Sequence, residues 1–161
     1  MKTSLIMIVF AFFLMTAAAG ADSQGKVQPD PTDPKKACRG FKPHELCFQT
    51  PKDGVARVEY LSEPFYAVIL KTTEPCMIKE EERLQAQALF PRSKVFSMRL
   101  QCNDNIEENI DYTNVDSKFG FLAVYAGTTL EEAKKRLAEV NATGRFPGAN
   151  IRKMQAKLLY P

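Results

Sequence analysis

Phe65-Tyr66-Ala67-Val68 and Phe121-Leu122-Ala123-Val124 begin two copies of one segment, which lie 56 residues apart in the chain. Without a gap, residues 65–98 and 121–154 share ten identities in 34 positions, including a Phe-Pro pair in each copy. Repeats of this kind are supersecondary units that cannot bury an apolar face alone and therefore pack against each other. The repeat predicts one domain built from two similar halves.

Each copy has the pattern of a strand, a helix and a second strand. The first strands are short β-branched and aromatic runs, and the second strands follow the Phe-Pro pairs. The expected strands are 65–71, 94–102, 119–126 and 150–159. In the second copy, Thr129 and Glu132 form a capping box that begins an amphipathic helix. In the first copy the helix is expected to begin near Thr73, with Pro75 in its first turn.

The order β-α-β-β-α-β predicts an α+β fold with a single ferredoxin-like sheet and two helices on one face. Right-handed crossovers place both helices on that side. The first strands of the copies are then central, and the second strands lie at the edges. The connection 103–118 is long and acidic, and we expect it to be a solvated loop.

The first 21 residues, 1–21, have the pattern of a secretory signal peptide. Lys2 precedes the apolar run Leu5–Met15, and small residues suited to cleavage follow. This run is too short to span a bilayer, so we expect no stable membrane anchor in the mature form and a periplasmic or secreted location. Residues 22–37 are predicted to be a flexible linker. A cysteine-containing extension, 38–60, then precedes the duplicated domain, 61–161.

All four cysteines lie in the exported part of the chain, where an even number indicates two disulfides. They are Cys38, Cys47, Cys76 and Cys102. Three pairings are possible, and we favour Cys38–Cys47 with Cys76–Cys102 because the second pair lies wholly within the first copy of the repeat. Zinc is disfavoured, since the chain has a single histidine and the cysteine spacing is not that of a metal knuckle.

The composition argues against nucleic-acid binding and against catalysis. The formal net charge is +3, and the lysines and arginines form no basic block. His44 is interpreted as a surface residue between two bridged cysteines. With the thiols oxidised, no cysteine nucleophile is expected. We therefore predict a non-enzymatic protein without a cofactor, a metal or a nucleic-acid partner.

Side-chain alternation predicts two different faces for the sheet. In the central strands, alternate residues such as Val68 and Val124 should face the helices, and the apolar edge residues Met98 and Met154 are placed on the same side. The opposite, helix-free face would have a polar, partly basic rim, which includes Arg99 and Lys153, around an aromatic centre. The residues of this centre are Phe65, Ala67, Ile69, Phe121, Ala123 and Tyr125.

Two explanations of such an apolar face are left open. In the first, the extension from Cys38 to Tyr60 folds across the face as a cover, and its alternating run 55–60 adds a strand. In the second, the face is a ligand platform, on which rings stack against sugar or base planes while basic side chains donate hydrogen bonds.

The second copy resembles half of the sporulation-related repeat (SPOR) domain. The resemblance rests on Leu122–Gly127, on Thr129–Ala133 and on Arg145–Ile151, and it extends over about residues 62–160. The first copy departs further, with Lys71 in place of the family's glycine. The resemblance implies a duplicated β-α-β sheet that binds peptidoglycan glycan strands stripped of stem peptides. The family's sheet-face site would map onto Phe65, Ile69, Phe121, Tyr125, Arg99 and Lys153.

Two functions are consistent with these patterns. The first is an exported, non-enzymatic binding domain that recognises peptidoglycan glycan strands through the helix-free face. The alternative is a protein-protein interaction module, such as an envelope assembly factor, a secreted effector or an inhibitor, whose face is covered by the extension.

Overall fold

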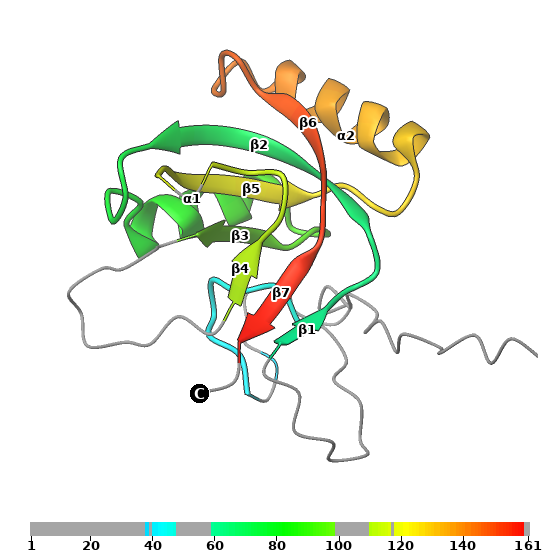
Figure 1. Cartoon of the computed structure of the whole chain (residues 1–161). Helices are drawn as coiled ribbons and strands as arrows, with labels where there is room; N and C mark the ends of the chain where they lie inside the picture. Colours follow the sequence, from blue (N-terminus) through cyan, green and yellow to red (C-terminus); the bar gives the residue numbers. More distant parts are fainter. Residues whose placement is uncertain (1–37, 39, 48–58, 99–109, 117, 160–161) are drawn as a thin grey trace, which may run out of the picture.

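The computed structural model describes residues 38, 40–47, 59–98, 110–116 and 118–159 (Figure 1). Its elements are β1 (Glu59–Leu61), β2 (Phe65–Thr73), α1 (Glu80–Leu89), β3 (Val95–Met98), β4 (Ile110–Tyr112), β5 (Gly120–Tyr125), α2 (Leu130–Ala142), β6 (Asn150–Met154) and β7 (Ala156–Leu159). The predicted α+β class is confirmed. The predicted signal peptide and linker lie outside the described residues.

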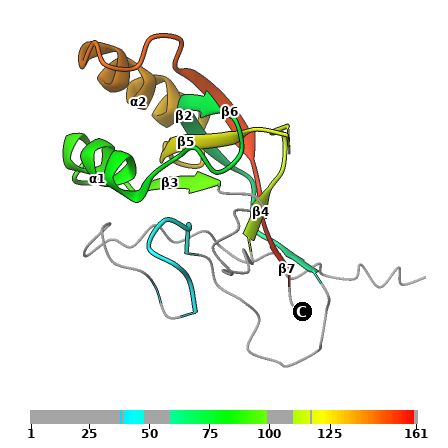
Figure 2. The same cartoon turned by 90° about the vertical axis from the view of Figure 1, so that its left-hand side faces the viewer.

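The prediction of a single sheet is wrong, because the strands form two antiparallel sheets. A four-stranded sheet has the order β3-β5-β2-β6, and a three-stranded sheet has the order β1-β7-β4. As expected, the first strands of the two copies are central in the larger sheet. Both helices lie on one face of the larger sheet. The smaller sheet, whose strand β7 follows β6 in the chain, extends away from the helices (Figure 2).

The second sheet arises because the expected strand 150–159 is broken at Gln155 into β6 and β7. Hydrogen bonds from neighbouring segments fill the break: the Thr113 N–H donates to the Gln155 carbonyl at 3.0 Å, and the Ala156 N–H donates to the Ser62 hydroxyl at 2.9 Å. After the break, β7 pairs with β1 on one side and β4 on the other. β4 lies in the connection that we expected to be a solvated loop, yet Ile110 and Tyr112 are buried.

The pairing register of the four-stranded sheet is symmetric under the 56-residue offset of the sequence repeat. Val68 pairs with its own counterpart, Val124, where the two central strands meet. At the edges, Phe65 pairs with Met154, and Phe121, the counterpart of Phe65, pairs with Met98, the counterpart of Met154. The same holds for every pair that the two edges share. The position opposite Ala67 on β6 therefore corresponds to the position opposite Ala123 on β3.

The two helices begin differently. α2 begins with the predicted capping box: the Thr129 hydroxyl accepts from the Glu132 N–H, and the Glu132 carboxylate accepts from the Thr129 N–H at 2.9 Å. The predicted start of α1 near Thr73 is wrong, because β2 continues to that residue and α1 begins only after Lys79. Three glutamates in the first turn of α1 complement the helix dipole there.

Polar side chains of α1 bind it to β3. The buried Arg83 guanidinium donates to the Val95 carbonyl at 3.1 Å and to the carboxylate of Glu80. The Gln87 amide donates to the carbonyls of Phe90 and Ser93 and accepts from the Val95 N–H, each at 2.8 Å. These bonds satisfy backbone groups that the turn between α1 and β3 would otherwise leave unpaired.

Two hydrophobic cores lie on opposite faces of the four-stranded sheet. The core on the helix side includes Val68, Val124, Ala133 and Val140. The core on the helix-free side includes Phe65, Phe96, Met98, Phe121, Met154 and Leu158. The prediction that Met98 and Met154 face the helices is wrong. It assumed a single core, whereas a sheet covered on both sides buries apolar residues on either face.

Candidate functional site

The helix-free face, on which the sequence placed the binding site, is largely an interior. Phe65 and Phe121 are only 1% and 2% exposed. Their rings contact Phe96, with ring centroids 6.3 and 5.8 Å apart, and the Tyr112 ring lies 5.5 Å from that of Phe121. The cover comes from several parts of the chain, because β4 and β7 contribute to it together with residues of the extension.

Within the extension, residues 38 and 40–47 form a segment that we call the bridged segment. The predicted Cys38–Cys47 disulfide is confirmed, with Cα atoms 5.8 Å apart. Leu46 is fully buried in the helix-free core, and its N–H donates to the Tyr112 hydroxyl at 3.3 Å. The prediction of a cover is therefore confirmed for this segment. The run 55–58 lies outside the described residues, and Glu59 and Tyr60 begin β1.

The bridged segment also occupies the outer edge of β3. The Ser97 N–H donates to the His44 carbonyl at 3.0 Å, and both views show the segment beside β3 (Figures 1 and 2). His44 itself is buried, so its interpretation as a surface residue is wrong. Cys76 is disulfide-bonded, whereas Cys102, its predicted partner, lies outside the described residues.

The structure does not bring the six predicted ligand-binding residues together on one open surface. Phe65, Ile69 and Phe121 belong to the core, with Ile69 5% exposed. Tyr125 is half-buried and lies against Phe65, with ring centroids 5.7 Å apart. Lys153 is on the helix side, where its Nζ lies 5.9 Å from the centre of the Tyr66 ring. Arg99 lies outside the described residues, and a role in ligand binding for any of the six stays a prediction.

One part of the helix-free face remains open, as a pocket of about 290 Å³ that we call the Arg152 pocket. Ile69 and Phe121 lie at its base, so it contains two of the six predicted residues. Its walls come from the loop between β4 and β5 and from β6. The other residues that line it are Thr72, Asn114, Val115, Asp116, Phe119, Asn150 and Arg152.

The rim of the Arg152 pocket combines one exposed ring with fixed polar groups. Phe119 is 44% exposed. The Asn114 amide, on a residue with φ of 59°, donates to the Lys153 carbonyl at 2.8 Å, and the Asp116 carboxylate accepts from the Lys118 N–H at 2.9 Å. The Arg152 side chain has no hydrogen bond or ion pair with any residue in the described ranges. Its guanidinium is therefore available to an anionic or polar ligand.

Sequence reasoning missed Arg152 because it assigned the wrong face to β6. Arg152 pairs with Ala67 and lies on the helix-free side, whereas its neighbour Lys153 pairs with Tyr66. A shift of one residue exchanges the faces of a strand. The repeat could not have corrected this, because Met98 and Met154, which are counterparts under its offset, were both given the wrong face. The pairing of Met154 with Phe65 corrects it, since paired residues share a face. The contribution of Asn114 and Asp116 depends on a loop conformation with no comparable signal.

Tyr125 borders a second hollow, of about 310 Å³, between the start of α2 and the turn at Arg92. Burial raises the pKa of Tyr125, and the negative charge of Glu132 raises it further. Hydrogen bonds from the Thr129 N–H, the Thr129 hydroxyl and the Thr128 N–H lower the pKa of Glu132 itself. The Glu132 carboxylate therefore serves as the cap of α2, and its negative charge keeps the Tyr125 hydroxyl neutral to higher pH.

Comparisons with known proteins leave the family of this chain open. The chain matches no protein-family model, no curated protein and no solved structure.

Within the described ranges, no group of three or more His, Cys, Asp or Glu side chains is placed to hold a metal ion. Neither of the two helices described is long and apolar enough to cross a membrane. A disulfide such as Cys38–Cys47 is typical of proteins in oxidising compartments.

Proposed function

We propose that this chain is an exported, non-enzymatic binding module whose partner is a protein. The observation that carries the proposal is the burial of the helix-free face, where Phe65 and Phe121 are covered by the chain's own segments. A glycan platform requires ring faces open to a sugar, and these two rings do not offer them. A module of this kind would act as an envelope assembly factor, a secreted effector or an inhibitor.

Export is part of the same proposal. It is supported by the signal-peptide pattern of residues 1–21 and by the Cys38–Cys47 disulfide. Both observations support a periplasmic or extracellular location. The bridged segment would then reach its folded form only after oxidation, because its cysteines close the loop that holds Leu46 in the core.

A distant relationship to the SPOR repeat family also belongs to the proposal. It is supported by the sequence segments named above and by the shared 56-residue offset of sequence and register, which is what a duplicated ferredoxin-like unit would produce. In this interpretation the ancestral sheet face has been filled by the bridged segment, β4 and β7. The fold would be retained while the ligand changed.

Glycan binding in the Arg152 pocket is a second candidate, and one observation favours it. An exposed ring, Phe119, lies beside the amides of Asn114 and Asn150 and the Arg152 guanidinium. Aromatic rings with planar hydrogen-bonding groups are suited to sugars. The pocket is smaller than an open sheet face, and a long glycan strand would contact it through only part of its length.

Sedimentation with peptidoglycan distinguishes the two candidates. Oxidised protein is mixed with intact or amidase-stripped peptidoglycan, pelleted, and compared with Phe119→Ala. We expect the protein to stay in the supernatant in every case. Preferential pelleting with stripped glycan, lost in Phe119→Ala, would refute the protein-partner proposal and establish the second candidate. A stoichiometric complex purified from the secreted or envelope fraction under non-reducing conditions would support the first.

A further inference from the structure

The two outer edges of the four-stranded sheet, β3 and β6, are counterparts under the 56-residue offset. The bridged segment is hydrogen-bonded to the β3 edge but not to the β6 edge. At the β3 edge, the Ser97 N–H is bonded to the His44 carbonyl, and Leu46, two residues further on, is buried in the helix-free core. The counterpart of Ser97 on β6 is Lys153. The bridged segment forms a turn here, in which the Glu45 N–H donates to the Lys42 carbonyl at 3.0 Å. The β3 edge therefore shows that another segment can bind this type of edge through one backbone bond and one apolar side chain.

The backbone of β6 presents unbonded groups at the equivalent place. The Tyr66 N–H and carbonyl bond to Gly127 and Ala126, so these groups of Tyr66 point toward β5 and those of its neighbour Ala67 point toward β6. Because the direction alternates along a strand, the groups of Arg152 point inward and those of Ile151 and Lys153 point outward. The Lys153 carbonyl accepts from Asn114. No described residue is bonded to the outward N–H groups of Ile151 and Lys153 or to the Ile151 carbonyl.

The Arg152 pocket opens beside this edge, on the side that corresponds to the position of Leu46 at the other edge. Arg152 is the counterpart of Phe96, which is fully buried. An arginine at this position leaves open a part of the face that a phenylalanine closes in the first copy. The base of the pocket, formed by Ile69 and Phe121, is apolar and suited to one aliphatic side chain.

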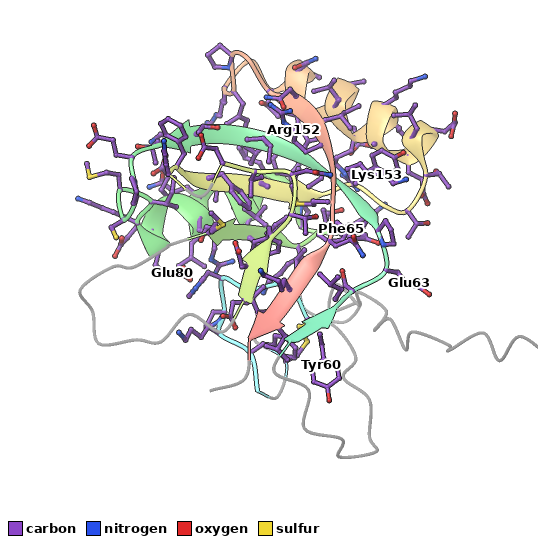
Figure 3. The ribbon with its side chains drawn as sticks, in the orientation of Figure 1. Tyr60, Glu63, Phe65, Glu80, Arg152 and Lys153 are labelled. Carbon is purple, nitrogen blue, oxygen red and sulfur yellow. A yellow bond between two sulfur atoms is a disulfide. The ribbon has the colours of Figure 1, made fainter. Side chains whose placement is uncertain are left out.

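The charge along the β6 edge is positive. β6 has two basic residues, Arg152 and Lys153, and no acidic one. Arg152 and Lys153 extend from β6 in Figure 3. Among the residues that line the pocket, the acidic one is Asp116, whose carboxylate accepts a hydrogen bond from the Lys118 N–H. An extended segment with an acidic residue two positions from an aliphatic one is complementary to this edge, because both side chains then lie on the same face as Arg152 and the pocket.

From these observations, we propose that the outer edge of β6 is the docking site for an extended, acidic segment of a partner protein. The segment adds as a short strand beside Ile151 and Lys153, inserts an aliphatic side chain into the Arg152 pocket, and pairs an acidic residue with Arg152. The inference rests on the proposed function, because it specifies the site and the chemistry of the protein partner. Strand addition of this kind takes its affinity from backbone bonds and its specificity from side-chain pockets.

Peptide binding to the full, oxidised protein tests the site. The probe is a fluorescein-labelled peptide, Thr-Glu-Thr-Leu-Thr-Glu, which places its leucine and its glutamates on one face of a strand and has about six residues, a usual strand length. A companion peptide has lysine in place of glutamate. We expect the acidic peptide to bind, to shift the amide NMR signals of Ile151 and Lys153, and to bind about tenfold more weakly to Arg152→Glu. Lys134→Glu, an equal charge reversal on the exposed face of α2, should bind as the wild type does.

Other outcomes would overturn the proposal. These are no binding of the acidic peptide, equal binding of the lysine peptide, equal affinity for Arg152→Glu, or amide shifts confined to other elements. Concentration-dependent dimerisation that Arg152→Glu abolishes would show that the occupant is a second copy and would also overturn it. The proposed function is judged separately by sedimentation and complex purification, so a protein complex that survives Arg152→Glu would refute the edge while leaving the function intact.

Discussion

Replacing Gln87 by methionine tests how strongly the turn between α1 and β3 depends on one buried amide. Gln87 is fully buried, and its side chain makes three hydrogen bonds of 2.8 Å to the backbone. Methionine has a similar size and a similar helix propensity, so the change removes the bonds with little change in volume or helix stability. The Phe90 carbonyl keeps a second partner, the Ser93 N–H at 3.1 Å. The Ser93 carbonyl and the Val95 N–H lose the bonds that Gln87 provides.

Each buried polar group that loses its partner costs about 1–3 kcal/mol, so two such groups give a loss of about 2–6 kcal/mol in the free energy of unfolding. A loss of about 4 kcal/mol would move the urea midpoint by about 2 M, given slopes of about 1–3 kcal/mol per M for small domains. The assay is urea denaturation of oxidised protein, followed by circular dichroism. Gln85→Met is the matched control, because Gln85 lies on the exposed side of the same helix and its loss should change stability by less than about 0.5 kcal/mol. Midpoints of the two variants that agree within the equivalent of about 1 kcal/mol would refute the reasoning.

Three further predictions concern the bridged segment and the start of α2. Leu46→Ala should lower the free energy of unfolding by about 2–5 kcal/mol because Leu46 is fully buried, whereas Met77→Ala, at an exposed residue, should change it by less than about 0.5 kcal/mol; equal losses in urea denaturation would contradict the packing of the segment. The folded-state pKa of Glu132 is lowered, so its contribution to stability is present above its usual pKa of 4.5 and is lost as the pH falls through the folded value. The melting temperatures of wild type and Glu132→Gln should therefore differ at neutral pH and converge in acid, and a difference that persists unchanged in acid would show that the ionised cap is not its cause. The pKa of Tyr125 is raised above its usual value of 10.0, so its neutral form contributes stability that is lost as the pH rises through the folded value. In a spectrophotometric titration, Tyr125→Phe should remove an ionisation above that value; removal of one at or below it would contradict the burial of the hydroxyl.

The sequence repeat was sufficient to predict the helices, the central position of β2 and β5, and the capping box of α2. It was sufficient because these features depend on local patterns and on an offset that can be read without a structure. The second sheet depends on long-range pairing: the three residues of β4 become a strand only because β7 offers an edge to Ile110 and Tyr112. Nothing local marks Gln155 as the break, since its neighbours alternate without interruption.

The candidate site was predicted less well, and for a different physical reason. Alternation shows which residues share a face, but burial on both faces removes the contrast that identifies the face. Phe65 and Phe121 were correctly placed opposite the helices, yet their exposure depended on other segments of the chain, namely the bridged segment, β4 and β7. Ile69 and Phe121 do border the open pocket, whereas Arg152 was missed by one residue.

The unequal treatment of the two sheet edges has a consequence for assembly. A duplicated sheet offers two similar edges, and a molecule with both edges open could join neighbours on either side and grow into a filament. In this protein the bridged segment is bonded to Ser97 and occupies the β3 edge. Edge-to-edge contact can then use only the β6 edge, which admits one added strand or one second molecule. Reduction of Cys38–Cys47 would loosen that closure. By holding the bridged segment at the β3 edge, the disulfide is expected to limit edge-to-edge association of the protein.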